Sequence, residues 1–183
     1  MRIQNLYFGP AVIGIFPLHL FCGMSLHEVL PGIDINSGTD TIRSVRHIAA
    51  GMNLARMCGL TDQKDWPDAC NMNLYEDGGM SVGWHSDDER LFQGKFTDVM
   101  IISLSFGISR RFELRLNWPE SGEKAVCKVM LGNGDMLSME GMCQKHMMHR
   151  VPKEDNKTGP RINLTWRWVL KHNAGCPTGR KRR

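Results

Sequence analysis

The stretch "RINLTWRW", residues 161–168, alternates strictly between polar and apolar side chains. Successive residues of a β-strand point to opposite faces of a sheet, so this pattern predicts a strand with one polar and one apolar face. The polar face carries two guanidinium groups, in the set Arg161, Asn163, Thr165 and Arg167. Such a face either meets solvent or lines a pocket that holds an anion, and periodicity alone does not separate these alternatives.

Several short segments before this stretch also have the pattern of strands. The run "DVMIISLSFG", residues 98–107, is continuously apolar over its first half, which is typical of a central strand covered on both faces. "RRFELRLNW", residues 110–118, alternates, and "AVCKVMLGNGDMLSMEG", residues 125–141, reads as two strands around a Gly-Asn-Gly turn. Many short strands separated by turn signals predict a mainly β fold, a sandwich or a barrel.

The chain divides into three parts by pattern. Residues 1–66 form an N-terminal extension in which "TDTIRSVRHIAAGMNLARMCG", residues 39–59, predicts a helix over about 41–58. The apolar segment 11–22 is too short to cross a bilayer and is interpreted as core or strand. Residues 67–171 form the predicted β core, and residues 172–183 form a basic tail that we expect to be disordered.

Charge and cysteine usage say little about partners but favour a reducing compartment. Of the 23 Lys and Arg residues, four lie at 180–183, so the remaining 19 balance the 19 Asp and Glu residues. This neutral body gives only a weak electrostatic argument for nucleic acid. The six cysteines form no C-x-x-C pair, which fits an intracellular protein of the nucleus or cytoplasm. We expect no membrane association and a monomer.

The segment "WHSDDE", residues 84–89, contains a candidate metal site. In extended backbone, His85 and Asp87 emerge on one face, and a third ligand is available downstream from His146 or His149. Two histidines and one carboxylate leave open positions on a non-haem iron, although H-x-D pairs also occur by chance on many surfaces. The two arginines of 161–167 suit a dicarboxylate such as 2-oxoglutarate, because guanidinium groups bind carboxylates bidentately.

Four segments together resemble the AlkB family of Fe(II)/2-oxoglutarate dioxygenases, and in particular its nucleic-acid demethylases. They are "NLYEDGGMSVGWHSDDE" (73–89), "ISLSFGISRRFELR" (102–115), "GDMLSMEGMCQKHMMHRVP" (134–152) and "RINLTWR" (161–167). The resemblance runs from about residue 68 to about 170, whereas residues 1–60 match only loosely. It implies a double-stranded β-helix, or jelly-roll, with one or more N-terminal helices packed on the outside and Fe(II) at one mouth.

The resemblance also implies roles for individual residues. The metal ligands would be His85, Asp87 and His149, where His149 is preferred to His146 because it precedes "RVP". The implied 2-oxoglutarate contacts are Asn73, Tyr75, Arg161, Asn163 and Arg167. Arg161 would pair with the far carboxylate of 2-oxoglutarate, and Arg167 would lie nearer the iron.

The implied activity is oxidative demethylation of N-alkylated bases, of the 1-methyladenine and 3-methylcytosine type, in DNA repair or RNA demethylation. The reaction would consume 2-oxoglutarate and O2 and release formaldehyde, succinate and CO2. Asp88 or Glu89 would favour these cationic bases. Residues 1–66 include a partial nucleotide-recognition lid at most, so single-stranded substrates are expected in preference to duplex.

Other interpretations of the same residues stay open. A 2-oxoglutarate dioxygenase that acts on a protein or another substrate would need the same iron and co-substrate residues. A non-enzymatic jelly-roll that binds nucleic acid is disfavoured because the candidate ligand set is complete. Trp84, next to His85, is expected to pack in the core.

Overall fold

The structure is a computed structural model that describes residues 4–8, 11–17, 58–118 and 127–172. The helix expected over about 41–58 falls almost wholly outside these residues, as does the basic tail from residue 173 onward. In the part of the chain that is described, no helix is long and apolar enough to cross a bilayer.

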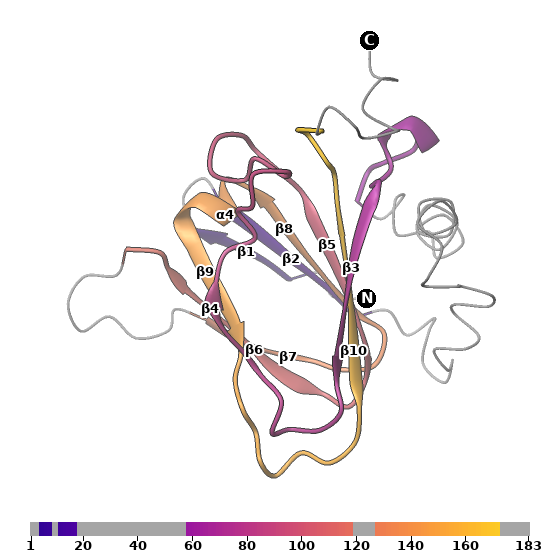
Figure 1. The fold of residues 1–183 in the computed structure, drawn as a ribbon, viewed down its shortest axis with the longest axis vertical. Helices are drawn as coiled ribbons and strands as arrows, with labels where there is room; N and C mark the ends of the chain where they lie inside the picture. The colour runs from indigo at the N-terminus through magenta and orange to yellow at the C-terminus, as the bar shows by residue number, and fades with distance from the viewer. Residues whose placement is uncertain (1–3, 9–10, 18–57, 119–126, 173–183) are drawn as a thin grey trace.

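The described chain forms two antiparallel sheets that face each other (Figure 1). The six-stranded sheet has the order β1 (Gln4–Phe8), β2 (Ala11–Pro17), β8 (Asp135–Gly141), β5 (Ile101–Gly107), β10 (Arg161–Arg167) and β3 (Ala69–Tyr75). The four-stranded sheet has the order β4 (Val82–His85), β9 (Met147–Val151), β6 (Arg110–Leu116) and β7 (Cys127–Leu131). Two short helical turns, η2 (Gln63–Asp65) and α4 (Cys143–His146), complete the described elements.

From β3 onward the chain passes repeatedly between the two sheets. Strands β3, β5, β8 and β10 belong to the large sheet, and β4, β6, β7 and β9 belong to the small one. This order confirms a mainly β protein and fits the expected jelly-roll. The segment expected as core or strand at 11–22 contributes β2, which pairs with β8 and places the β1–β2 hairpin at the edge of the large sheet.

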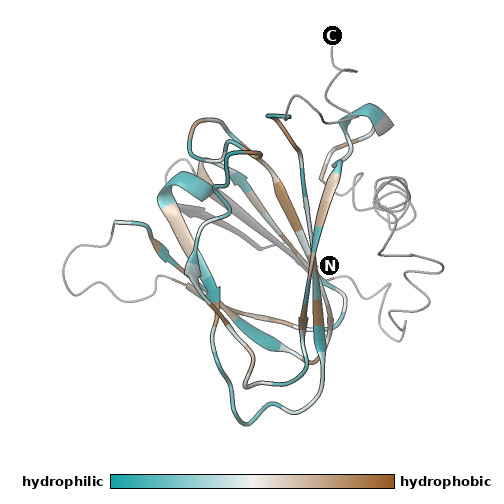
Figure 2. Cartoon of the chain, viewed as in Figure 1, coloured by the Kyte–Doolittle hydropathy of each residue, from teal (hydrophilic) through white to brown (hydrophobic). Residues whose placement is uncertain are grey.

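Two hydrophobic clusters cover the two faces of the large sheet. Outside, Leu104 of β5 packs with Leu164 and Trp166 of β10, and between the sheets Ile101 packs with Leu114 of β6. Strand β5 is therefore buried on both faces, as its continuous apolar run predicts. Among the strands that Figure 2 draws in colour, both sheets contain hydrophobic as well as hydrophilic residues.

A glycine fixes the start of β10. Gly107, at the end of β5, has φ +89°, and a Cβ placed there would overlap the carbonyl oxygen of Pro160. Only glycine combines this backbone conformation with so close an approach. The two strands consequently pair from Arg161 onward, opposite Gly107, which sets the register of the whole polar face of β10.

Trp84 does not pack in the core, contrary to expectation. In the small sheet His85 pairs with His149, and both side chains face the interior. Neighbouring residues of a strand point to opposite faces, so Trp84 points outward. Its half-buried ring lies instead against the guanidinium groups of Arg115 and Arg150.

Candidate metal centre

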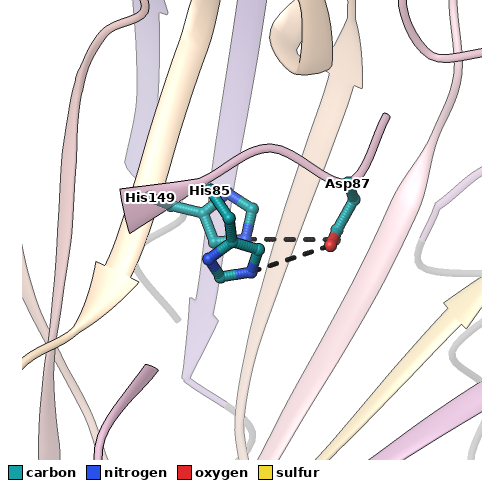
Figure 3. A group of neighbouring side chains, drawn as sticks. All are labelled: His85, Asp87 and His149. Atoms are coloured by element: carbon teal, nitrogen blue, oxygen red, sulfur yellow. Dashed lines mark ion pairs between the residues drawn. The ribbon is translucent and has the colours of Figure 1, made fainter. Parts of the chain in front are cut away.

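The structure brings the three predicted ligands together from β4, the loop after it, and β9. One ligand atom from each of His85, Asp87 and His149 lies within 4.8 Å of the others (Figure 3). The cross-strand pairing of His85 with His149 places their ring centroids 4.2 Å apart. His146, the alternative ligand, ends α4 and is not a member of this group.

The two imidazoles are held in a form that can bind a metal. Nδ1 of His85 lies 2.8 Å from the carbonyl oxygen of Gly83. Because a carbonyl only accepts, Nδ1 donates this bond, which leaves Nε2 as the ring nitrogen that can face a metal. Burial lowers the pKa of His149 to about 3, with the nearby His85 and Arg167 acting in the same direction, so this ring is neutral at neutral pH.

The loop that carries Asp87 is anchored by two side-chain bonds. The backbone N–H of Asp87 donates to Oε1 of Gln144 at 2.9 Å, and the Ser86 hydroxyl donates to the carbonyl oxygen of Met147 at 2.9 Å. Gln144 is only 1% exposed. It packs closely against Gly94, since a Cβ added to that glycine would lie 2.9 Å from the Cβ of Gln144. Sequence reasoning missed Gln144, because a single buried polar residue in a four-residue helix leaves no periodic signal.

Arg167 connects the carboxylate of this group to a second acidic residue. Its Nη2 lies 2.8 Å from Oδ1 of Asp87, and its Nη1 lies 3.0 and 3.2 Å from the two carboxylate oxygens of Glu89. Burial raises the pKa of Asp87, while the charge of Arg167 opposes that rise. The polar face of β10 therefore looks inward, and the alternative in which it meets solvent is wrong.

A cavity of about 180 Å³ lies between the sheets beside these residues. Its lining includes the three candidate ligands, Arg167, Glu89, Asn73, Tyr75, Asn163 and Thr165. Asn71 lines it as well and was missed, although the alternation of "NMNLY" places Asn71, Asn73 and Tyr75 on one face of β3. Asn163 donates to the Ser103 hydroxyl at 2.8 Å, which fixes its amide within the cavity wall.

Arg161 is a buried guanidinium that lacks an ionic partner. It is 1% exposed, lies 5.3 Å from the Tyr75 ring centroid, and donates one bond to the Ser105 hydroxyl at 2.9 Å. Its Nε and Nη1 have no hydrogen-bond partner, and no carboxylate of the described residues pairs with it. Burial lowers the pKa of Arg161. An unpaired buried charge is costly, so this group suits an incoming carboxylate.

A second buried arginine shows what a structurally satisfied guanidinium looks like in this fold. Arg110 donates to the carbonyl oxygens of Asp77, Met80 and Pro152 at 2.7–2.8 Å, and its Nε lies 3.3 Å from a Glu154 carboxylate oxygen. These bonds tie the loops around residues 77–80 and 152–154 together. In contrast to Arg110, Arg161 has two buried nitrogens without a hydrogen-bond partner.

The two acidic residues after Asp87 have different surroundings. Asp88 forms an ion pair with Lys95, with a distance of 2.8 Å between Oδ2 and Nζ, and it is not part of the cavity lining. Glu89 lines the cavity and is held by Arg167, although about half of its side chain is exposed. Of the two candidates for contact with a base, only Glu89 therefore faces the cavity.

Comparisons with known proteins agree with this geometry. A family model described as the 2OG-Fe(II) oxygenase superfamily matches residues 36–167. The human alpha-ketoglutarate-dependent dioxygenase alkB homolog 3 is 44% identical over 110 residues, which cover 57% of this chain and 37% of that protein. The human DNA oxidative demethylase ALKBH2 is 36% identical over 104 residues, and its Arabidopsis thaliana namesake is 33% identical over 118 residues. Both matches cover 54% of this chain. They cover 38% of the human protein and 37% of the Arabidopsis thaliana protein.

Proposed function

The chain belongs to the 2OG-Fe(II) oxygenase superfamily, and from this premise we propose that it is an oxidative demethylase of N-alkylated bases in DNA or RNA. Its resemblance to the AlkB family is confirmed by the relatives it matches. The chain spans little more than a third of the length of those relatives, 37–38%. The observation that carries the proposal is the convergence of His85, Asp87 and His149 beside the inward-facing Arg167.

The donor set fits the cofactors that the superfamily name implies. Two imidazoles and one carboxylate match the ligand set of non-haem Fe(II) oxygenases, and His85, Asp87 and His149 would hold the metal. Bound Fe(II), with 2-oxoglutarate and O2, supplies the oxidant that hydroxylates an N-methyl carbon while 2-oxoglutarate becomes succinate and CO2. The hydroxymethyl product then loses formaldehyde and leaves the unmodified base.

The residues of the chain bind and orient the reactants. Arg161 would receive the far carboxylate of 2-oxoglutarate through its unpartnered guanidinium N–H groups, with Tyr75, Asn73 and Asn163 lining the adjacent cavity. Arg167 would remain next to the metal, where it neutralises part of the charge of Asp87. These groups are held by the sheet and by buried bonds, which is the preorganisation that an oxygenase site requires.

The proposed substrate class is supported by Glu89, an acidic residue that lines the cavity. 1-Methyladenine and 3-methylcytosine are cationic, and Glu89 would favour them over neutral bases through a carboxylate that lines the cavity. A base in a duplex cannot reach this interior without flipping out, which costs roughly a few kcal/mol. We therefore propose that single-stranded nucleic acid is the preferred substrate. We also propose that the enzyme is intracellular and monomeric.

The deciding experiment is turnover of defined oligonucleotides. Single-stranded and duplex DNA and RNA that carry 1-methyladenine or 3-methylcytosine are incubated with Fe(II), 2-oxoglutarate and ascorbate, and the products are weighed by mass spectrometry. We expect a loss of 14 Da per methyl group, the mass of CH2, from the single strands first. His149→Ala should abolish the reaction, whereas His146→Ala, the control outside the candidate ligand group, should preserve it. Succinate formation without loss of methyl groups would instead favour a protein or another substrate.

A further inference from the structure

The outer face of the four-stranded sheet carries a group of cations. In the register of the sheet, Glu113 of β6 lies opposite Arg150 of β9 and opposite Lys128 of β7. Cross-strand partners share a face, and this face is the reverse of the one that carries His149, the residue before Arg150. We call it the outer basic face and define it by six residues: Trp84, Arg111, Glu113, Arg115, Lys128 and Arg150.

The charges on this face do not cancel. Four cations surround one carboxylate, which leaves a net charge of +3 (4 − 1) among the six residues. The buried carboxylate of Glu113 accepts from Arg150 at 2.7 Å and lies 3.4 Å from Nε of Arg111, so it is shared by two arginines. Within the described ranges, neither Arg115 nor Lys128 forms an ion pair. Nε of Arg115 is also buried without a hydrogen-bond partner.

Trp84 organises two of these cations without neutralising them. The guanidinium carbon atoms of Arg115 and Arg150 lie 4.5 and 4.6 Å from the Trp84 ring centroid. A cation–π contact fixes a guanidinium in place but leaves its charge available to an external anion, whereas a carboxylate would cancel that charge. Arg150 is already paired with Glu113, so Arg115 is the guanidinium on Trp84 whose charge remains available. A preorganised guanidinium without a carboxylate partner suits phosphate, whose oxygens accept two parallel N–H bonds.

The outer basic face begins one residue away from the candidate metal centre. Trp84 and His85 are neighbours whose side chains leave opposite faces of β4, and β4 is the edge strand of its sheet. Gly83 is exposed, and a Cβ placed there would meet no atom within 4 Å. At Gly83, therefore, no side chain separates the two faces of the small sheet at its β4 edge.

We propose that the outer basic face is a second contact surface, which binds the phosphate backbone of single-stranded nucleic acid flanking the base in the cavity. This inference rests on the proposed demethylase function, because that function identifies the bound polyanion as nucleic acid. Arg115 and Lys128 contact phosphates directly, and Trp84 keeps Arg115 in position. The face reads no base, so it adds affinity for longer strands of any sequence, DNA or RNA.

Binding is tested separately from catalysis with unmethylated probes. Fluorescein-labelled single-stranded DNA and RNA of roughly 20 nucleotides, longer than a typical single-domain footprint, are titrated by anisotropy at several salt concentrations. The double variant Arg115→Gln/Lys128→Gln is compared with Lys157→Gln/Lys171→Gln, which removes the same charge elsewhere, and with Arg115→Lys. Circular dichroism and the thermal midpoint establish that each variant is folded.

We expect the double variant Arg115→Gln/Lys128→Gln, called the patch variant below, to bind about fivefold more weakly at low salt, since two cationic contacts are lost. The slope of log K against log salt should fall by about 1.4, or about 0.7 per phosphate contact on a single strand. The charge-matched control should bind as the wild type does. Arg115→Lys keeps the charge but loses the forked donors, so it should bind with an affinity between those of the wild type and the patch variant. Equal binding by the patch variant and the charge-matched control would overturn the proposal.

Turnover measurements test the role of the outer basic face separately from the proposed demethylase function. The patch variant should demethylate a methylated trinucleotide like the wild type, whereas its KM for the long strand should rise with kcat unchanged. Unchanged KM for the long strand would refute the outer basic face and leave the demethylase intact. A wild type that demethylates neither substrate would refute the proposed function and with it the role given to this face.

Discussion

Arg167 forms a nearly buried ion pair with Asp87, with 2.8 Å between Nη2 and Oδ1. Its Nη1 simultaneously binds the carboxylate of Glu89, and its guanidinium carbon lies 4.9 Å from the Phe92 ring centroid. One side chain at the end of β10 therefore opposes the rise that burial causes in the pKa of Asp87 and also holds Glu89 at the cavity. The first prediction follows from this pair.

Replacing Arg167 should destabilise the metal-free protein more than the metal-bound protein. Arg167→Gln leaves the buried carboxylate of Asp87 without its cation, which costs roughly 3 kcal/mol in such pairs. A divalent cation would supply the missing charge. Thermal melts with and without Mn(II) should therefore show a larger metal-induced rise in Tm for Arg167→Gln than for the wild type. An equal rise would show that the ion pair does not compensate Asp87 in the absence of metal.

Arg161 should control the binding of 2-oxoglutarate but not of metal. Arg161→Lys keeps the charge but loses the forked donor geometry, so the apparent Kd for 2-oxoglutarate should rise by about tenfold or more. Mn(II) affinity should stay close to that of the wild type, because Arg161 is not among the candidate ligands. Titration calorimetry measures both constants, and a parallel loss of metal binding would argue for general misfolding.

Gln144 should position Asp87 through its backbone. Gln144→Leu removes the acceptor of the Asp87 N–H, and a buried unsatisfied donor costs about 1–3 kcal/mol. Residues that hold metal ligands typically affect metal affinity by about 10–100-fold, and we expect a weaker Mn(II) Kd in that range. Lys145→Leu, on the exposed side of the same short helix, is the matched control. A normal Kd in Gln144→Leu would assign the hydrogen bond to stability alone.

The buried imidazole of His149 should make the metal-free fold sensitive to acid. Its pKa is lowered to about 3 in the folded protein from an ordinary value of 6.5, so the unfolded chain binds a proton that the folded chain excludes. The contribution to stability is therefore complete above pH 6.5 and is lost progressively as the pH falls toward 3. Urea melts should show a shallower loss of stability over this range for His149→Gln. An unchanged pH profile in that variant would contradict the lowered pKa.

The sequence predicted the faces of strands better than their partners. Alternation in 161–167 correctly separated the buried guanidinium face from the apolar face that packs with β5. Alternation carries no information about which strand lies alongside, so the division of β7 and β8 between two sheets was not predictable from the turn at 132–134. The pairing register shifts between Val82 and His85, so the sequence did not predict that Trp84 points outward.

The candidate site was predictable where its residues belong to spaced motifs. His85, Asp87 and His149 follow from the H-x-D pair, a distal histidine and the family resemblance, and the structure brings all three together. Gln144 depends on a contact across 57 positions of sequence, which no local pattern encodes. The different surroundings of Asp88 and Glu89 likewise arise from Lys95 and Arg167, which only the fold places beside them.

The visible spectrum of the anaerobic protein tests most directly whether these three side chains chelate one iron beside a 2-oxoglutarate pocket. Addition of Fe(II) and then 2-oxoglutarate should produce a weak charge-transfer band in the wild type and in His146→Ala. The band should be absent from His85→Ala, Asp87→Ala and His149→Ala. A wild-type protein that binds no Fe(II), or a band that survives all three substitutions, would contradict the account.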